Sequence, residues 1–287
     1  MTNNITEEER IRRRREKFSA HKSKSIINDP LADISLLSRS GNSKLIQTLR
    51  NDPDIREQLI SDIENIVEDR SKSHLVEHGL RKLREIFSSC RENRDIHKGM
   101  FWNQADRVYN LSYRYYLESG QISKLGGLVL KPIIEWFPEV IKNKYLPIYG
   151  IYLTHYEKDT SKFIDECLSN SFLITENDMV LTQMANIYSL NTDAVGKWFQ
   201  LYEKLVPIQK HFLQEAHIHN EMARRSLNTI ERSYNQLSLH TISKLWYHSK
   251  IPNDIRDLLI TQFESKRTLD NLDDIIMFKK KRRLQVK

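Results

Sequence analysis

Apolar residues recur at three- and four-residue spacing along most of the chain, which is the spacing of amphipathic helices. After Asp52-Pro53 one apolar stripe predicts a helix, and a second stripe follows from Leu75 to Phe87. A third predicts a helix from about Ile96 to Glu118 that stops at Gly120. Its inward-facing residues are expected to be Phe101, Ala105, Val108, Tyr109, Ser112, Tyr115 and Tyr116.

The same spacing continues downstream with short breaks. It predicts helices near 121–136, 139–156, 160–169, 176–188 and 192–205, a long helix from Pro207 to about Gln236, and shorter ones near 239–249, 253–265 and 270–278. No segment shows sustained two-residue alternation, so we expect no sheet. Tyr-rich segments at 109–116 and 145–156 recur at about the tetratricopeptide period. The predicted fold is all-α, with antiparallel helical pairs stacked as a degenerate TPR- or HEAT-like repeat.

The chain divides into three predicted parts. Residues 1–42 comprise a basic helix, which a Thr6/Glu9 capping box begins, and a linker from Asn28 to Asn42. Residues 43–278 form the helical-repeat domain, and residues 279–287 form a basic tail.

Positive charge is concentrated at the two ends. The chain of 287 residues has a formal net charge of +7. Residues 1–25 hold eight basic residues and four Glu, a balance of +4, and residues 279–287 hold six basic residues and no acid. The remaining body, 26–278, is therefore at −3. A basic surface spread over the whole fold is correspondingly disfavoured, although a local patch is compatible with this balance.

Several protein classes are excluded by composition. Two cysteines, Cys90 and Cys167, do not suffice for a disulfide framework or a cysteine-based zinc site, which favours a reducing compartment. The longest weakly charged stretch, Leu125–Leu153, is interrupted by lysine and glutamate, so no membrane span is expected. The acidic residues Glu7, Glu8 and Glu9 argue against a secretory or transit peptide.

One cluster has the residue types of a metal enzyme: His211, Glu215, His217, His219 and Glu221. On a continuous helix, His211, Glu215 and His219 would share one face. Imidazole and carboxylate groups can hold zinc, but positions i and i+8 lie about 12 Å apart along a helix. A solvated helical face is therefore the preferred interpretation, and metal-dependent catalysis is kept as a weaker alternative.

No other chemistry-bearing motif points to an enzyme. The sequence has no Gly-x-Ser-x-Gly elbow, and the pair Gly126–Gly127 lacks the flanking residues of a phosphate-binding loop. We interpret that pair as a close helix contact or a helix break. No catalytic residue, metal site or cofactor is predicted.

Residues 181–200 resemble helices 2 and 3 of a homeodomain, with Val195, Trp198 and Phe199 at the spacing of the recognition helix. Where that family places an adenine-reading Asn and an Arg, this chain has Leu201 and Glu203. We therefore interpret Val195, Trp198, Phe199 and Tyr202 as core residues of an ordinary helical pair.

The two basic segments are the candidate contact sites. The arm Thr6–Ser19, with Arg10, Arg12, Arg13, Arg14 and Arg15, is similar to the cytosolic arm by which fungal receptors for tail-anchored membrane proteins engage their targeting ATPase. A basic helical arm can equally bind nucleic acid, an acidic protein surface or anionic lipid, and lipid insertion is the least favoured of these because the arm has no clear apolar face. The tail carries Lys279, Lys280, Lys281, Arg282 and Arg283, a cluster typical of nuclear localisation signals or nucleic-acid contacts.

These observations favour a non-catalytic helical scaffold or adaptor with protein partners, a subunit of a nuclear assembly acting near DNA or RNA. The main alternative is a sequence-nonspecific nucleic-acid-binding protein, such as an RNA-coating nucleoprotein. Nucleic acid would then be contacted through the basic tails. The expected location is the nucleus, with possible shuttling to the cytoplasm.

Overall fold

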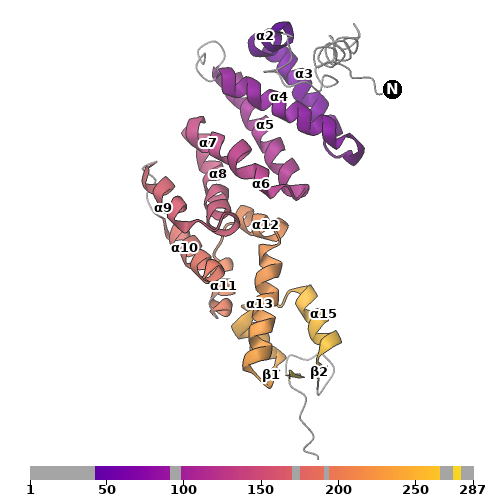
Figure 1. The fold of residues 1–287 in the computed structure, drawn as a ribbon, viewed down its shortest axis with the longest axis vertical. Coiled ribbons are helices and arrows are strands. Elements are labelled where there is room, and N and C mark those ends of the chain that lie inside the picture. Colours follow the sequence, from indigo (N-terminus) through magenta and orange to yellow (C-terminus); the bar gives the residue numbers. More distant parts are fainter. Residues whose placement is uncertain (1–42, 91–97, 170–174, 191–193, 266–273, 279–287) are drawn as a thin grey trace, which may run out of the picture. The chain divides into compact units, whose positions relative to one another are not determined.

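The computed structural model describes residues 43–90, 98–169, 175–190, 194–265 and 274–278 (Figure 1). These residues belong to two units, one that ends at Tyr115 and one that begins at Tyr116. The predicted N-terminal helix and linker, 1–42, and the basic tail, 279–287, lie outside the described residues. The described residues are mostly helical, as predicted, and none of their helices has the length and apolar character of a membrane span.

The N-terminal unit consists of helices that pack along their apolar stripes. Its elements are α2 (Ser43–Asn51), α3 (Pro53–Ile66), the 3₁₀ turn η2 (Arg70–Lys72), α4 (Ser73–Cys90) and most of α5 (Lys98–Glu118). Helices α3 and α4 lie side by side in Figure 1, and α2 contacts both. The seven residues expected to face inward on α5 are all buried, from Phe101 to Tyr116. The stripe prediction is confirmed there.

Local signals explain where these helices begin and end. The Asp52 carboxylate accepts hydrogen bonds from the backbone N–H groups of Asp54 and Ile55, and Pro53 occupies the first helical position of α3. Helix α5 ends at Glu118, two residues before Gly120. Gly120 has a φ of +70°, a left-handed conformation that favours glycine and that does not continue a helix.

Two arginines connect the helices of this unit. Arg56 on α3 is buried and donates to the carbonyl oxygens of Leu49 and Arg50, at the C-terminal end of α2. Its Nε also donates to Gln104 Oε1 on α5 at 3.1 Å. Arg107 on α5 pairs with Glu57 and Glu64 on α3. Because a buried polar group requires partners, the contacts of Arg56 fix how α2, α3 and α5 pack, and the half-exposed ion pairs of Arg107 add to the contact between α3 and α5.

The described residues of the C-terminal unit form helices up to residue 233, and short strands occur with further helices after it. Its helices are α6 (Ile122–Leu125), α7 (Lys131–Trp136), α8 (Glu139–Ile151), α9 (Thr160–Ser169), α10 (Glu176–Ser189), α11 (Val195–Tyr202), α12 (Pro207–Glu215), α13 (Ile218–Ser233), α14 (Leu239–Thr241) and α15 (Asn253–Gln262). Three π-helical segments interrupt this series: η3 (Gly126–Leu130), η4 (Tyr152–Tyr156) and η5 (Ile242–Trp246).

Aromatic side chains fill the core of this unit. His155 is fully buried in η4, and its ring stacks on Tyr188 with centroids 5.6 Å apart. Trp198, also fully buried, contacts the rings of His155, Phe199 and Tyr202. Burial lowers the pKa of His155 to about 3, so this imidazole is neutral.

Gly126 is a point of close approach between two π-helical segments. A Cβ at this position would overlap the ring of Tyr152 in η4, whereas a Cβ at the neighbouring Gly127 would meet no atom within 4 Å. The interpretation of the glycine pair as a close helix contact is therefore confirmed for Gly126.

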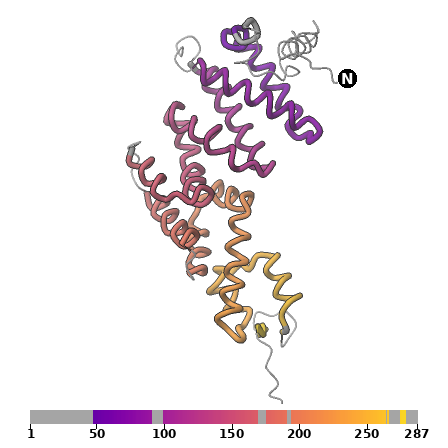
Figure 2. The backbone as a smooth tube through the Cα atoms, in the orientation of Figure 1, coloured from indigo at the N-terminus to yellow at the C-terminus, as the bar shows by residue number. Residues whose placement is uncertain are grey.

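Two predictions about this unit are wrong. The long helix Pro207–Gln236 is two helices, α12 and α13, because His217 adopts a left-handed conformation with a φ of 59° (Figure 2).

The expectation of no sheet is also wrong. Strand β3 (Ile275–Met277) lies where a helix was expected, and it pairs antiparallel with β1 (Gln236–Ser238) and β2 (Glu264–Ser265), in the order β1-β3-β2. Neither feature has a local signal, since no glycine or proline marks His217 and the strand partners are distant in sequence.

Candidate interaction surface on helix α13

Helix α13 has one apolar and one polar face. Its buried residues include Ile218, Met222, Ala223, Leu227 and Ile230, at the spacing of one helical stripe. On the buried side Ala223 also accepts, through its carbonyl oxygen, a hydrogen bond of 3.0 Å from the Tyr247 hydroxyl. The opposite face is therefore held towards solvent.

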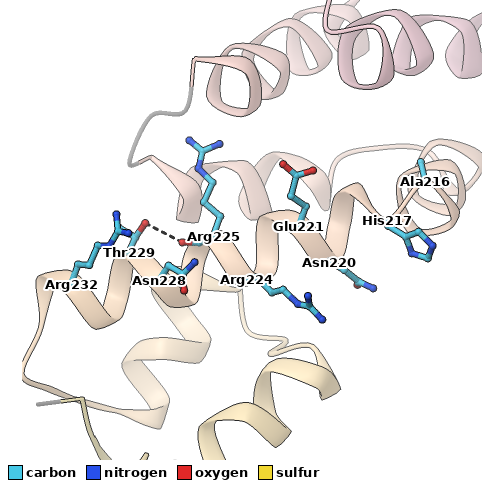
Figure 3. A pocket seen from close by; sticks show the side chains of 9 residues that line it. All are labelled: Ala216, His217, Asn220, Glu221, Arg224, Arg225, Asn228, Thr229 and Arg232. Atoms are coloured by element: carbon cyan, nitrogen blue, oxygen red, sulfur yellow. Dashed lines mark hydrogen bonds between the residues drawn. The ribbon is translucent and has the colours of Figure 1, made fainter. Parts of the chain in front are cut away.

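A hollow of about 680 Å³ runs along this polar face. We call it the α13 groove, and its described lining residues are Ala216, His217, Asn220, Glu221, Arg224, Arg225, Asn228, Thr229 and Arg232 (Figure 3). This set holds three arginines and one glutamate, and the exposed Glu231 lies on the same helix. The three arginines and two glutamates of α13 leave it one positive charge in surplus.

Two lining residues are tied to α10. Arg225 donates to the carbonyl oxygens of Ile187 and Tyr188, each at 3.1 Å, near the C-terminal end of α10. Glu221 accepts a hydrogen bond of 2.7 Å from the Tyr188 hydroxyl. Burial, and then this bond to Glu221, raise the pKa of Tyr188, so the hydroxyl stays protonated. Both side chains project to the same side of α13 in Figure 3.

Three further lining residues, Arg224, Asn228 and Arg232, are exposed and follow one another at i, i+4 and i+8. In Figure 3, Arg224 and Asn220 project to the side of α13 opposite Arg225 and Glu221. The exposed Glu231 lies on the same helix, seven residues beyond Arg224 and therefore on its face. The exposed surface of α13 thus carries guanidinium, amide and carboxylate groups.

The described elements that follow α13 are strand β1, helix α14 with η5, helix α15 and strands β2 and β3, and the three strands form a sheet in the order β1-β3-β2.

The predicted His211–Glu221 cluster does not form one helical face. His211 is exposed on α12, while His217 stands at the break and Glu221 lies on α13. His219 packs instead against Trp198, Phe199 and Tyr202, and burial lowers its pKa. Over the described part of the chain, no group of three histidine, cysteine, aspartate or glutamate side chains is placed to hold a metal ion.

The residues that resemble a homeodomain lie in the core. Val195, Trp198, Phe199 and Tyr202 on α11 are all buried, and Tyr202 is 6% exposed. The interpretation of these four residues as part of an ordinary helical pair is therefore confirmed.

The candidate contact residues in the basic segments, from Arg10 to Arg15 and from Lys279 to Arg283, lie outside the described residues. The α13 groove was not predicted. Its signal in the sequence is the spacing of Arg224, Asn228 and Arg232 opposite the apolar stripe, which becomes readable once the helix is known to begin at Ile218.

Comparison with protein-family models, curated proteins and solved structures finds no match for this chain.

Proposed function

We propose that this protein is a non-catalytic helical adaptor, a subunit of a nuclear assembly that acts near DNA or RNA. The observation that carries the proposal is the α13 groove, a hollow lined by guanidinium and amide side chains on a helix that neighbouring elements hold in place. Such groups bind an anionic partner by hydrogen bonds and charge, but they do not form a nucleophile with an adjacent base.

Three titratable groups with strongly perturbed pKa values are core residues. Burial lowers the pKa of His155 and raises the pKa values of Tyr109 and Tyr247. Perturbed groups in a catalytic site are expected to reach a cleft where substrate can enter, whereas these three residues are at most 2% exposed.

The helical pairs of the C-terminal unit are proposed to be degenerate repeats. Helix α7 contacts α8, α10 contacts both α9 and α11, and α12 contacts α13. Packing of consecutive helices is the principle of helical-repeat proteins, whose exposed faces bind partner proteins.

Exposed apolar side chains on this unit are candidate protein contacts. Val140 on α8 is 85% exposed and Leu245 in η5 is 62% exposed. Large apolar side chains that protrude from a surface are suited to the desolvated centre of a protein interface.

Affinity purification of the tagged full chain from cells that encode it tests the proposal. We expect a reproducible set of partner proteins at stoichiometric amounts, and we expect Val140→Glu or Leu245→Glu to remove at least one of them, since a buried unpaired carboxylate opposes association. Gln200→Glu, at an exposed polar position, serves as the matched control and should retain every partner. A chain that purifies alone under mild salt conditions would contradict the adaptor function.

A further inference from the structure

We infer that a cavity lined by helices α7, α8, α9 and α10 receives an aromatic side chain of a partner protein, in a segment where lysine or arginine flanks that side chain. The inference rests on the proposed adaptor function and names the chemistry of one partner contact, at a site that shares no residue with the α13 groove. It is carried by the size of the cavity, by its apolar floor and by the carboxylates of its wall.

The cavity has a volume of about 250 Å³ and lies within the C-terminal unit. Its described lining comes from α7, α8, α9, the start of α10 and Val206, which precedes α12. Helix α7 packs on α8, and α10 contacts both α8 and α9 (Figure 1). An apolar cavity of about 150 Å³ is large enough to bind benzene, so this one has room for a single aromatic side chain.

The floor of the cavity is apolar and buried. Its residues Ile134, Tyr149, Phe163 and Cys167 are each at most 8% exposed. The Phe163 ring lies close to the backbone of α8 because Gly150 has no side chain: a Cβ there would lie 2.9 Å from Phe163 Cε2. Aromatic rings pack well on one another in edge-to-face or offset contacts. The floor therefore favours an aromatic occupant over a polar one.

The cavity opens to solvent at a rim that includes Asn143, Thr175 and Val206. These three lining residues are exposed, and Val206 is 40% exposed. An apolar hollow with a partly exposed rim is the arrangement of an anchor site in a protein interface, where one buried side chain is surrounded by residues that exclude water. A partner side chain can enter this cavity while its backbone stays at the rim.

Two carboxylates line the cavity, and its described lining holds no lysine, arginine or histidine. Glu166 accepts a hydrogen bond of 3.3 Å from the Tyr149 hydroxyl, which holds its carboxylate beside the floor. Asp178 accepts bonds from the backbone N–H and the hydroxyl of Thr175, and both of these bonds use Oδ2. Its Oδ1 atom can therefore accept from a cationic group of a ligand.

The helices around the cavity add to this negative charge. Helices α9 and α10, which supply both carboxylates, hold one lysine and four carboxylates, and α7 to α10 together hold four lysines and six carboxylates. That lysine, Lys162, is paired with Glu157 at 2.7 Å. A partner segment with lysine or arginine beside its anchor is therefore attracted to this surface, and an acidic segment is repelled.

The thiol of Cys167 does not make the cavity a reactive site. Burial, and then the charges of Asp178 and Glu166, raise the pKa of this thiol to about 11, so it stays protonated near neutral pH. A protonated thiol is a poor nucleophile. The lining thus supplies packing and charge, and Cys167 serves as a reporter of whether the cavity is occupied.

Fluorescence anisotropy of the full chain with rhodamine-labelled peptides tests the inference. The probe is Gly-Ser-Lys-Phe-Lys-Ser-Gly, and two companion peptides replace both lysines by glutamine or the phenylalanine by alanine. We expect the glutamine peptide to bind about three- to tenfold more weakly than the probe, because it lacks the charges. The alanine peptide lacks the anchor and should bind at least about tenfold more weakly.

The double variant E166Q/D178N removes both charges of the cavity and keeps the shape of the side chains. It should bind the lysine peptide about three- to tenfold more weakly and leave the affinity for the glutamine peptide unchanged. The matched control is D165N/E176Q, since these two exposed carboxylates lie on the same helices but outside the described lining. It should bind the lysine peptide like the unmodified chain.

Cys167 locates the bound peptide. In the variant C90S it is the one remaining thiol of the chain, and saturating lysine peptide should slow its reaction with N-ethylmaleimide about threefold or more. The variant C167M should fill part of the cavity and weaken binding of the lysine peptide by about threefold or more. Circular dichroism should show unchanged helix content in both variants.

Equal losses in E166Q/D178N and in D165N/E176Q would overturn the inference, since any carboxylate of these helices would then suffice. It would also be overturned if the lysine peptide does not bind, as when the chain itself fills the cavity, or if bound peptide leaves the reaction rate of Cys167 unchanged. The peptides are tested without any co-purified protein. Partners that co-purify with a chain that binds no peptide would therefore refute this contact and leave the adaptor function standing.

Discussion

Single buried polar side chains have a large influence on the stability of this protein, and His155 is the clearest case. Its Nδ1 lies 2.9 Å from the Thr154 hydroxyl, while its ring is enclosed by Tyr188 and Trp198. Nε2 has no hydrogen-bond partner among the described residues, so nothing there stabilises a second proton. This imidazole is a neutral packing residue, and its titration belongs to folding rather than to function.

Acidification is expected to destabilise the C-terminal unit through His155. In the unfolded chain this residue titrates near its ordinary pKa of 6.5, whereas in the folded chain its pKa is about 3. Below pH 6.5 the unfolded state binds a proton that the folded state excludes, so the free energy of unfolding falls with pH by about 1.4 kcal/mol per unit. Urea unfolding at pH 7 and pH 5 should show this as a loss of about 2 kcal/mol.

The variant H155F should lack that part of the pH dependence, because phenylalanine keeps the ring contacts and cannot be protonated. His211 is exposed on α12, and H211Q should keep the pH dependence of the unmodified chain. If H155F and the unmodified chain lose equal stability between the two pH values, His155 does not carry the effect.

Arg56 has a comparable role in the N-terminal unit. Its guanidinium is buried and supplies donors to two carbonyl oxygens of α2 and to Gln104. The variant R56M keeps most of the aliphatic volume but leaves these acceptors without their donor, which should cost about 2–4 kcal/mol of unfolding free energy. Chemical unfolding followed by circular dichroism measures the loss. K72M, which removes an exposed lysine paired with Asp69, should leave the unfolding midpoint unchanged.

At the scale of elements, two adjacent glycines give a matched comparison. Gly126 accommodates the Tyr152 ring, whereas Gly127 is exposed with open space around its Cα. We expect Gly126→Ala to lower the free energy of unfolding by about 1–3 kcal/mol through overpacking. Gly127→Ala should raise it by up to about 1 kcal/mol, because alanine favours helix. Thermal unfolding of both variants shows which of them is more stable. A Gly126→Ala variant more stable than the unmodified chain would refute the close contact between Gly126 and Tyr152.

Most helices follow from local signals, and the exceptions follow from contacts distant in sequence. Helix α3 begins after its N-cap Asp52, and α10 begins at the Thr175/Asp178 capping box. Helix α5 ends just before Gly120. The break at His217 has no such mark. There, α12 packs against α8, while α13 packs against α11 and α15. The continuous apolar pattern that predicts one long helix is therefore buried against two different sets of neighbouring helices.

At the scale of the whole molecule, the net charge of +7 does not describe the folded body. The two ends hold ten surplus positive charges and the body between them is at −3. Within that body α13 carries three arginines, Arg224, Arg225 and Arg232, against the two glutamates Glu221 and Glu231, so it has one positive charge in surplus. A total charge therefore predicts less about binding than the position of each cation does.

The basic tail is also predicted to direct the protein to the nucleus. Deleting Lys279–Lys287 removes a compact cluster of the kind that import receptors recognise. Fluorescence microscopy of a tagged chain should show the protein shifting out of the nucleus on deletion. The variant K197A/K204A, which loses two cations elsewhere, should keep its distribution, and unchanged nuclear accumulation after the deletion would contradict the signal.

The sequence by itself determined the helical character, most helix boundaries, the inward faces of α5 and α11 and the distribution of charge, because each depends on periodicity, capping or a count of residues. Tertiary structure alone decided the break at His217, the pairing of Gln236–Ser238 with Ile275–Met277 and the formation of the α13 groove. These three depend on neighbours that are far apart along the chain, and a local pattern contains no information about which neighbours will meet.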